Sequence, residues 1–130
     1  MKLSKSEEQL MQYLWEMEEA FLSDLLEKYP EPKPASSTVA TLLKRMNKKG
    51  FIDYEQMGRS RRYYPLVKKS DYFSKHLNSL IKKFFNGSPS TFASFFTTET
   101  DLSDEELEEL QEIINREIDK RNQWFRTYYI

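Results

Sequence analysis

The sequence contains no cysteine, only three glycines and a single histidine. Without thiols the chain has no disulfides, no thiolate metal ligands and no cysteine nucleophile. The glycines are too scattered for a phosphate-binding loop, and His76 falls inside a predicted helix. The acidic residues 104–109 match a metal site in composition only, because carboxylates also stabilise a helix N-terminus. The sequence therefore predicts no catalytic residues, no enzymatic activity, no cofactor and no metal.

Long apolar runs are absent as well. No stretch of the sequence is long and apolar enough to span a bilayer, and the start MKLSKSEEQ has no apolar signal-peptide core. We therefore expect a soluble cytoplasmic protein without membrane insertion. With 130 residues and 38% hydrophobic composition, the chain suffices for one domain, or for one small domain with an appended element.

The chain lacks an overall excess of charge of either sign, since it has 20 basic and 21 acidic residues. The charges are nevertheless segregated along the sequence. Residues 33–69 hold ten basic residues against two acidic ones, whereas residues 70–130 hold seven against eleven. A basic segment followed by an acidic one indicates two different roles. Two ordinary solvated faces are the alternative interpretation.

The first half of the sequence alternates between two periodicities. Residues 4–17 and 35–50 repeat apolar side chains at helical spacing, and Ser4 and Glu7 have the spacing of a capping box at the start of the first helix. A short helix with Ser23 as its N-cap is expected between these two segments. Residues 51–66 then alternate with the period of a strand, turn at Met57-Gly58 and return, with Tyr64 joining the second strand to the core. The order helix, helix, helix, hairpin is that of a winged helix-turn-helix.

The third predicted helix carries a polar stripe opposite its apolar face. Such a helix fits the major groove, where short polar side chains reach base edges and cations neutralise phosphates. We expect Ser36 or Ala35 to cap this helix. The stripe predicts DNA contacts from Ser36, Ser37, Thr38, Thr41, Lys44, Arg45 and Lys48. The alternative is an amphipathic helix with a solvated face.

The hairpin concentrates three arginines in the motif GRSRRYY. Guanidinium groups at a projecting tip suit phosphate or minor-groove contacts, so Arg59, Arg61, Arg62 and Tyr63 are further candidate DNA contacts. Arg62 has a structural alternative, because it can pair with Asp53 or Glu55 across the hairpin.

Residues 70–130 read as three helices with broad apolar faces. So short a helical segment buries such faces poorly by itself, and a symmetric homodimer is the commonest remedy. The predicted dimerisation residues are Phe73, Leu77, Leu80, Ile81, Phe84, Phe92, Phe95, Phe96, Leu107, Leu110, Ile113, Ile114 and Ile118. The predicted fold is mainly α with a small β-hairpin: a winged helix-turn-helix domain (1–69) followed by a helical dimerisation domain (70–130).

Four motifs taken together resemble the penicillinase-repressor family of bacterial regulators. They are LMQYLW, STVATLLKRMNKKGFIDYE, GRSRRYYPLV and DLSDEELEELQEIIN, which follow one another over nearly the whole chain. The resemblance implies a dimeric transcriptional repressor that binds double-stranded DNA at an inverted-repeat operator. In the antibiotic-responsive branch it also implies a membrane-bound sensor metalloprotease, which triggers cleavage within the short helix of the dimerisation domain.

The family's cleaved bond joins an asparagine to a phenylalanine, and it aligns with Phe95-Phe96, so Phe95 replaces the asparagine. The copper-responsive relatives use cysteines near the C-terminus, which this chain lacks. From the residues alone, a second function stays open: a winged-helix protein-interaction module, without sequence-specific DNA binding, whose basic face meets an acidic partner.

Overall fold

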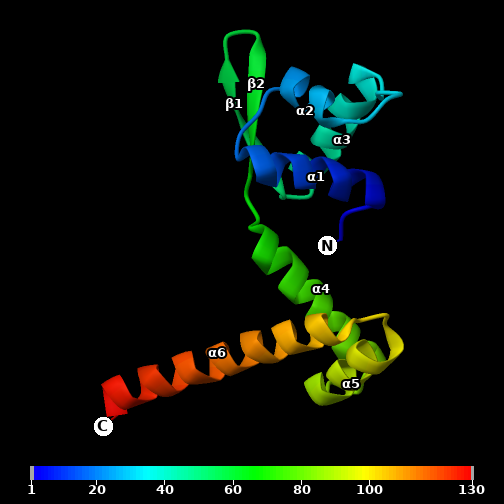
Figure 1. Ribbon diagram of the computed structural model, residues 1–130. Coiled ribbons are helices and arrows are strands. Elements are labelled where there is room, and N and C mark those ends of the chain that lie inside the picture. Colours follow the sequence, from blue (N-terminus) through cyan, green and yellow to red (C-terminus); the bar gives the residue numbers. More distant parts are fainter. Residues whose placement is uncertain (1, 130) are drawn as a thin grey trace. The chain divides into compact units, whose positions relative to one another are not determined.

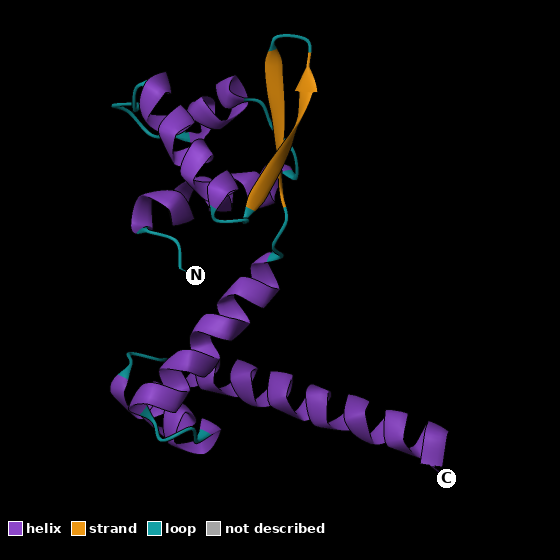
Figure 2. Cartoon of the chain, turned by 180° about the vertical axis from the view of Figure 1, so that it is seen from behind, coloured by secondary structure: helices purple, strands orange, loops and turns teal. Residues whose placement is uncertain are grey.

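The computed structural model describes residues 2–129 and is mainly helical, with one antiparallel hairpin (Figures 1 and 2). The element order is α1 (Lys5–Met17), α2 (Leu22–Lys28), α3 (Ser36–Lys48), β1 (Ile52–Met57), β2 (Ser60–Pro65), α4 (Lys69–Phe84), α5 (Pro89–Glu99) and α6 (Asp104–Tyr129). This is the predicted winged helix-turn-helix followed by C-terminal helices. Contacts divide the chain into two compact units, with the division inside α4 after Leu77.

The first unit packs α1, α2 and α3 around one apolar core, with the hairpin beside them (Figure 1). Leu10 and Leu14 of α1 and Leu43 of α3 are completely buried, because helical spacing puts the apolar side chains of each helix on one face. The whole buried apolar set comprises Leu3, Leu10, Met11, Leu14, Ala20, Leu25, Tyr29, Val39, Leu43, Met46, Phe51, Ile52, Tyr63 and Tyr72.

The helix starts follow local hydrogen-bonding rules. Ser4 and Glu7 form the expected capping box of α1. The expectation that Ser23 caps α2 is wrong: the helix begins at Leu22, and the backbone N–H of Phe21 donates to the Asp24 carboxylate over 2.9 Å. Asp24 itself reaches back to the helix start, so a hydroxyl at the cap is not needed.

The hairpin turns through Gly58 and Arg59, with Met57 opposite Ser60. Gly58 has a φ of 64°, a value that glycine adopts without steric cost at the first position of a two-residue turn. The backbone of Ala20, between α1 and α2, adds a short bridge to the other edge of β2: its N–H donates to Tyr63 over 2.9 Å. One bridging residue leaves no periodic signal, so the sequence did not reveal it.

The expected orientation of β2 is reversed in the structure. Tyr63 is only 9% exposed and belongs to the core, whereas Leu66 is 54% exposed and Tyr64 is partly buried. A shift of one residue in a strand moves a side chain to the opposite face. Tyr63, and not Tyr64, therefore joins the hairpin to the helices.

The first turns of α4 are anchored to the winged-helix unit. Tyr72 is buried, and its hydroxyl donates to Glu8 over 2.8 Å and accepts from the Leu3 backbone N–H over 3.3 Å. Burial, followed by the hydrogen bond to Glu8, raises the pKa of Tyr72 to about 12. The indole N–H of Trp15 donates to the backbone oxygen of Val67 over 2.8 Å, just before α4.

The second unit comprises the end of α4, α5 and α6. Phe85, which follows α4, lies with its ring centroid 5.5 Å from Phe92 and 5.3 Å from Phe95 of α5. Ser103 and Glu106 form the expected capping box before α6. Among the described side chains from residue 78 to residue 128, none is buried, so the apolar faces of these helices stay accessible in the single chain.

Candidate nucleic-acid interface

The polar stripe of α3 is fully accessible in the structure. Every predicted contact residue on this helix is exposed: Ser36, Ser37, Thr38, Thr41, Lys44, Arg45 and Lys48. Ala35 is the N-cap, and its methyl side chain accepts no hydrogen bond from the helix; Ser36 is the first helical residue. The Thr41 hydroxyl donates to the backbone oxygen of Ser37 over 2.9 Å, and its oxygen lone pairs remain available to an incoming donor.

The three wing arginines lie in three different environments. Arg62 pairs with Glu55 directly across the hairpin at 2.9 Å and with Glu19 at 3.4 Å. Arg61 is exposed and stacks on Tyr54, with its guanidinium carbon 4.3 Å from the ring centroid. Arg59 is exposed at the turn, and within residues 2–129 no side chain pairs with it.

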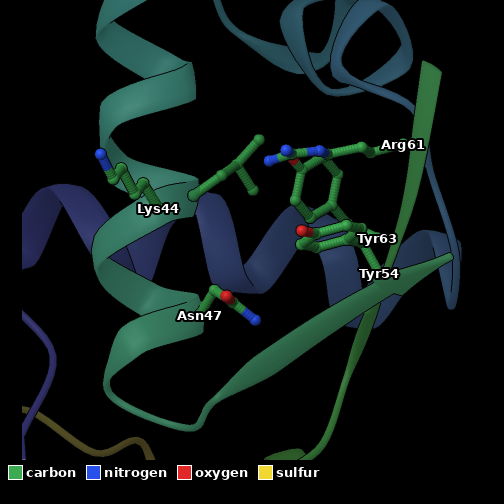
Figure 3. Close-up of a pocket in the computed structure, with 6 residues that line it drawn as sticks. Lys44, Asn47, Tyr54, Arg61 and Tyr63 are labelled. Atoms are coloured by element: carbon green, nitrogen blue, oxygen red, sulfur yellow. The ribbon is translucent and has the colours of Figure 1, made fainter. Parts of the chain in front are cut away.

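Helix α3 and the hairpin enclose a hollow of about 370 Å³ (Figure 3). Arg61 extends from β2 toward α3 above the rings of Tyr54 and Tyr63, while the Lys44 amine points away from Arg61 in this view. The hollow is lined by Leu43, Lys44, Asn47, Tyr54, Arg61 and Tyr63. Asn47 is held in place because its amide donates to the backbone oxygen of Ile52 over 2.9 Å.

A second hollow, of about 380 Å³, lies between the hairpin and the start of α2. Arg59, Ser60 and Arg61 line it together with Ser23. Both hollows therefore carry cationic side chains of the hairpin, and both open beside helices of the winged-helix unit. Neither contains a cluster of acidic side chains that would repel a phosphate.

Glu7, Lys49 and Ser4 fix the far end of α3 against α1. The Lys49 amine lies 2.7 Å from the Glu7 carboxylate, and Glu7 is buried. Burial alone raises the pKa of Glu7, but hydrogen bonds from Lys49 and Ser4 outweigh this effect, so the pKa lies below its usual value. The charge of Lys49, which follows the cationic stripe of α3, is therefore paired with Glu7.

Comparison with known protein families identifies the family of this chain. Residues 3–116 match the model of the penicillinase repressor family. The chain belongs to this family. The match begins in front of α1 and ends within α6, so it extends into both units of this penicillinase repressor family member.

Named relatives agree with the family match. The methicillin resistance regulatory proteins MecI of Staphylococcus aureus (strain N315) and Mammaliicoccus sciuri are 33% and 32% identical to this family member over 116 residues, covering 88% of this chain and 94% of each relative. The penicillinase repressor of Bacillus licheniformis is 25% identical over 123 residues, covering 94% of this chain and 96% of the relative.

The candidate dimerisation residues of this penicillinase repressor family member fall into two groups. Phe73 belongs to the first unit, where its ring centroid lies 5.9 Å from that of Trp15. The other group is exposed or partly buried on α4, α5 and α6: Leu77, Leu80, Ile81, Phe84, Phe92, Phe95, Phe96, Leu107, Leu110, Ile113, Ile114 and Ile118.

The helices and the acidic side chains bear on membranes and metals. No helix within residues 2–129 has the length and apolar character needed to cross a membrane. Across the same residues, no three histidine, aspartate or glutamate side chains gather closely enough to hold a metal ion.

Proposed function

We propose that this protein is a transcriptional repressor that binds double-stranded operator DNA through α3 and the hairpin wing. The observation that carries the proposal is the exposed cationic and hydroxyl stripe of α3 beside a wing with two exposed arginines. An α-helix enters the major groove with its N-terminal end toward the bases. Ser37, Thr38 and Thr41 occupy that end, whereas Lys44, Arg45 and Lys48 follow where phosphates flank the groove. The names of the relatives, a regulator of methicillin resistance and a penicillinase repressor, support the same function.

The proposed operator is an inverted repeat, bound by a homodimer. Two recognition helices related by a two-fold axis read half-sites about one helical turn apart. A dimer is supported by the lack of buried side chains between residues 78 and 128, since exposed apolar surface of this extent is typical of an interface. Joining two DNA-binding units raises the effective concentration at the second half-site, so the dimer binds more tightly than the monomer.

The experiment that tests this function is footprinting of the purified full-length protein on the DNA upstream of its own gene. We expect a protected segment with two related half-sites at moderate salt. Lys44→Ala should weaken protection, and it should lower the slope of log K against log salt by about one unit if Lys44 neutralises one phosphate. Lys120→Ala on α6 is the matched control, because it removes the same charge outside the interface. Equal binding to all duplexes of the same length would contradict the proposed function of a repressor that recognises an operator.

Release by proteolysis is the finer part of the proposal. The Phe95-Phe96 bond lies within α5, where the two side chains are 49% and 37% exposed. A protease requires an extended substrate, and a helix without buried residues opens locally at small cost. A membrane-bound sensor metalloprotease is the proposed origin of the signal. Mass spectrometry of the chain from β-lactam-treated cells should find a product ending at Phe95; an intact chain during induction would contradict this route.

The alternative of a winged-helix protein-interaction module makes a different prediction in the same experiment. Such a module would give no footprint at moderate salt, and its affinity for duplexes would be independent of their sequence. The short hydroxyl side chains of Ser37, Thr38 and Thr41, all exposed at the start of α3, favour groove entry over a flat protein interface.

A further inference from the structure

Arg61 is held in a fixed direction by the aromatic side chains beneath it. Its guanidinium carbon lies 4.3 Å above the ring centroid of Tyr54. The Tyr54 ring in turn contacts Tyr63, with 5.6 Å between their centroids. Tyr63 is only 9% exposed, and hydrogen bonds in both directions join its backbone to Ala20. Tyr63 is therefore fixed to the core, Tyr54 packs against Tyr63, and the guanidinium of Arg61 rests on Tyr54.

The strand register explains why these side chains meet. Tyr54 and Tyr63 are directly opposite each other in the hairpin, and Arg61 is two residues before Tyr63 on the same strand. Alternate residues of a strand share a face, so Arg61, Tyr63 and Tyr54 lie on the face that looks toward α3 (Figure 3). Arg62 lies on the opposite face, where Glu55 neutralises it.

We propose that Tyr54 is a positioning residue for DNA binding: its ring holds Arg61 extended between the wing and α3, ready to contact a backbone phosphate beside the groove. This inference rests on the proposed function. The geometry supports a phosphate contact because the guanidinium is exposed, has no carboxylate partner among the described residues, and opens into the hollow beside Asn47. A free arginine loses side-chain entropy on binding, whereas Arg61 is already restricted before DNA arrives.

The face of the Tyr54 ring holds Arg61 in place, and the phenol hydroxyl is not needed for this contact. A cation is attracted to the negative face of an aromatic ring, and a phenylalanine provides that face as well. Tyr54→Phe should therefore preserve the effect, while Tyr54→Leu should remove it and keep an apolar side chain against Tyr63. An exposed cation–π contact of about 0.5–1 kcal/mol corresponds to a loss of about two- to fivefold in affinity.

A double-mutant cycle measures this coupling. Fluorescence anisotropy is recorded with a labelled 40-base-pair duplex from the DNA upstream of the gene, and with a scrambled duplex of equal composition. We expect Tyr54→Leu to weaken binding about two- to fivefold in the chain with Arg61, and to have no effect in the Arg61→Ala background. Tyr54→Phe should bind like the unchanged protein. Tyr64→Leu, on the other face of the strand, is the matched control for loss of an aromatic ring.

Nuclear magnetic resonance of the free protein tests the geometry without DNA. The Arg61 Nε–Hε signal should lie upfield through the ring current of Tyr54, keep its position in Tyr54→Phe, and move to the random-coil position in Tyr54→Leu. Thermal unfolding of each variant shows whether the fold is retained. The inference would be overturned if Tyr54→Leu caused the same loss of affinity in the chain with Arg61 and in the Arg61→Ala chain. It would also be overturned by an Arg61 signal at the random-coil position in the unchanged protein. If the unchanged protein binds no duplex at all, the proposed function is contradicted instead. The Arg61 signal still tests the position of the Arg61 side chain in that case.

Discussion

The guanidinium of Arg62 lies 2.9 Å from the carboxylate of Glu55, directly across the hairpin. Arg62 also approaches Glu19 at 3.4 Å. Two carboxylates therefore accompany the one arginine of the wing that is partly buried, whereas Arg59 and Arg61 lack such partners among residues 2–129. Three neighbouring arginines thus differ in the charge that each can present to DNA.

The first prediction separates Arg59 from Arg62. Arg59→Ala should lower the salt slope of DNA binding by about one unit, because a lost phosphate contact releases one counterion fewer. Arg62→Ala should leave the slope within experimental error, since Glu55 and Glu19 already balance its charge. Salt titrations of anisotropy between 50 and 200 mM, about the range over which such slopes are resolved, provide the measurement.

The second prediction concerns Glu55 itself. Glu55→Gln should tighten binding to any duplex severalfold at low salt, because it removes a negative charge from the wing and releases Arg62 toward the phosphates. The gain should vanish in the Arg62→Ala background if release of the arginine causes it. A gain of the same size in both backgrounds would mean that only the removed carboxylate charge matters.

The third prediction places the contact of the proposed dimer on α6. Ile114 and Ile118 are 59% and 51% exposed in the single chain. Ile114→Glu should convert the dimer to a monomer in sedimentation velocity experiments, because a buried unpaired carboxylate is strongly unfavourable. Asn115→Glu adds the same charge to the next residue, which lies on another side of the helix, and should leave the dimer intact. A dimer that persists in Ile114→Glu would refute this placement of the interface.

The fourth prediction follows from the pair of the buried Glu7 and the partly exposed Lys49. The pKa of Glu7 is lower in the folded protein than its ordinary value, so its ionised form stabilises the fold. This contribution is present above the pKa of the unfolded chain and is lost as the pH falls through the folded pKa. Glu7→Gln should therefore lower the urea midpoint at pH 7 and flatten its decrease below about pH 4.5. An unchanged pH profile would exclude Glu7 as a cause of acid sensitivity.

The fifth prediction tests the anchor of α4. Tyr72→Phe removes the hydroxyl that joins the Leu3 N–H to the Glu8 carboxylate. The free energy of unfolding should fall by about 1–3 kcal/mol, since partly buried hydrogen-bonding groups lose their partner. His76→Phe, beside Tyr72 at 4.3 Å between ring centroids, is the comparison variant that keeps the Tyr72 hydroxyl. Urea unfolding monitored by circular dichroism measures both.

The local patterns of the sequence were sufficient for the succession of elements. The helical spacing of Val39, Leu42, Leu43 and Met46 predicted the buried face of α3. Val39, Leu43 and Met46 are completely buried, whereas Leu42 is only partly buried. Ser4 and Glu7 predicted the start of α1 correctly. Helical spacing, capping and glycine turns depend on only a few neighbouring residues, so they can be recognised in the sequence before the fold is known. The resemblance to the family, drawn from four such motifs, is confirmed by the match over residues 3–116.

Relationships between distant segments depended on the tertiary structure. Alternation along β2 could not say whether Tyr63 or Tyr64 meets the core, because the answer depends on which face the helices cover. The bridge from Ala20 joins β2 to a segment more than forty residues earlier in the chain. The burial of Tyr72 likewise requires Glu8 and Leu3 to meet α4.

By itself the sequence determined the helices, the hairpin, the cationic stripe and the family, because each depends on neighbouring residues or on motifs in linear order. Only the tertiary structure decided how the arginines of GRSRRYY differ. Cross-strand register sets Arg62 against Glu55, and it sets Arg61 over Tyr54 on the face toward α3. The charge that each arginine has available for DNA depends on those partners, which come from elsewhere in the fold.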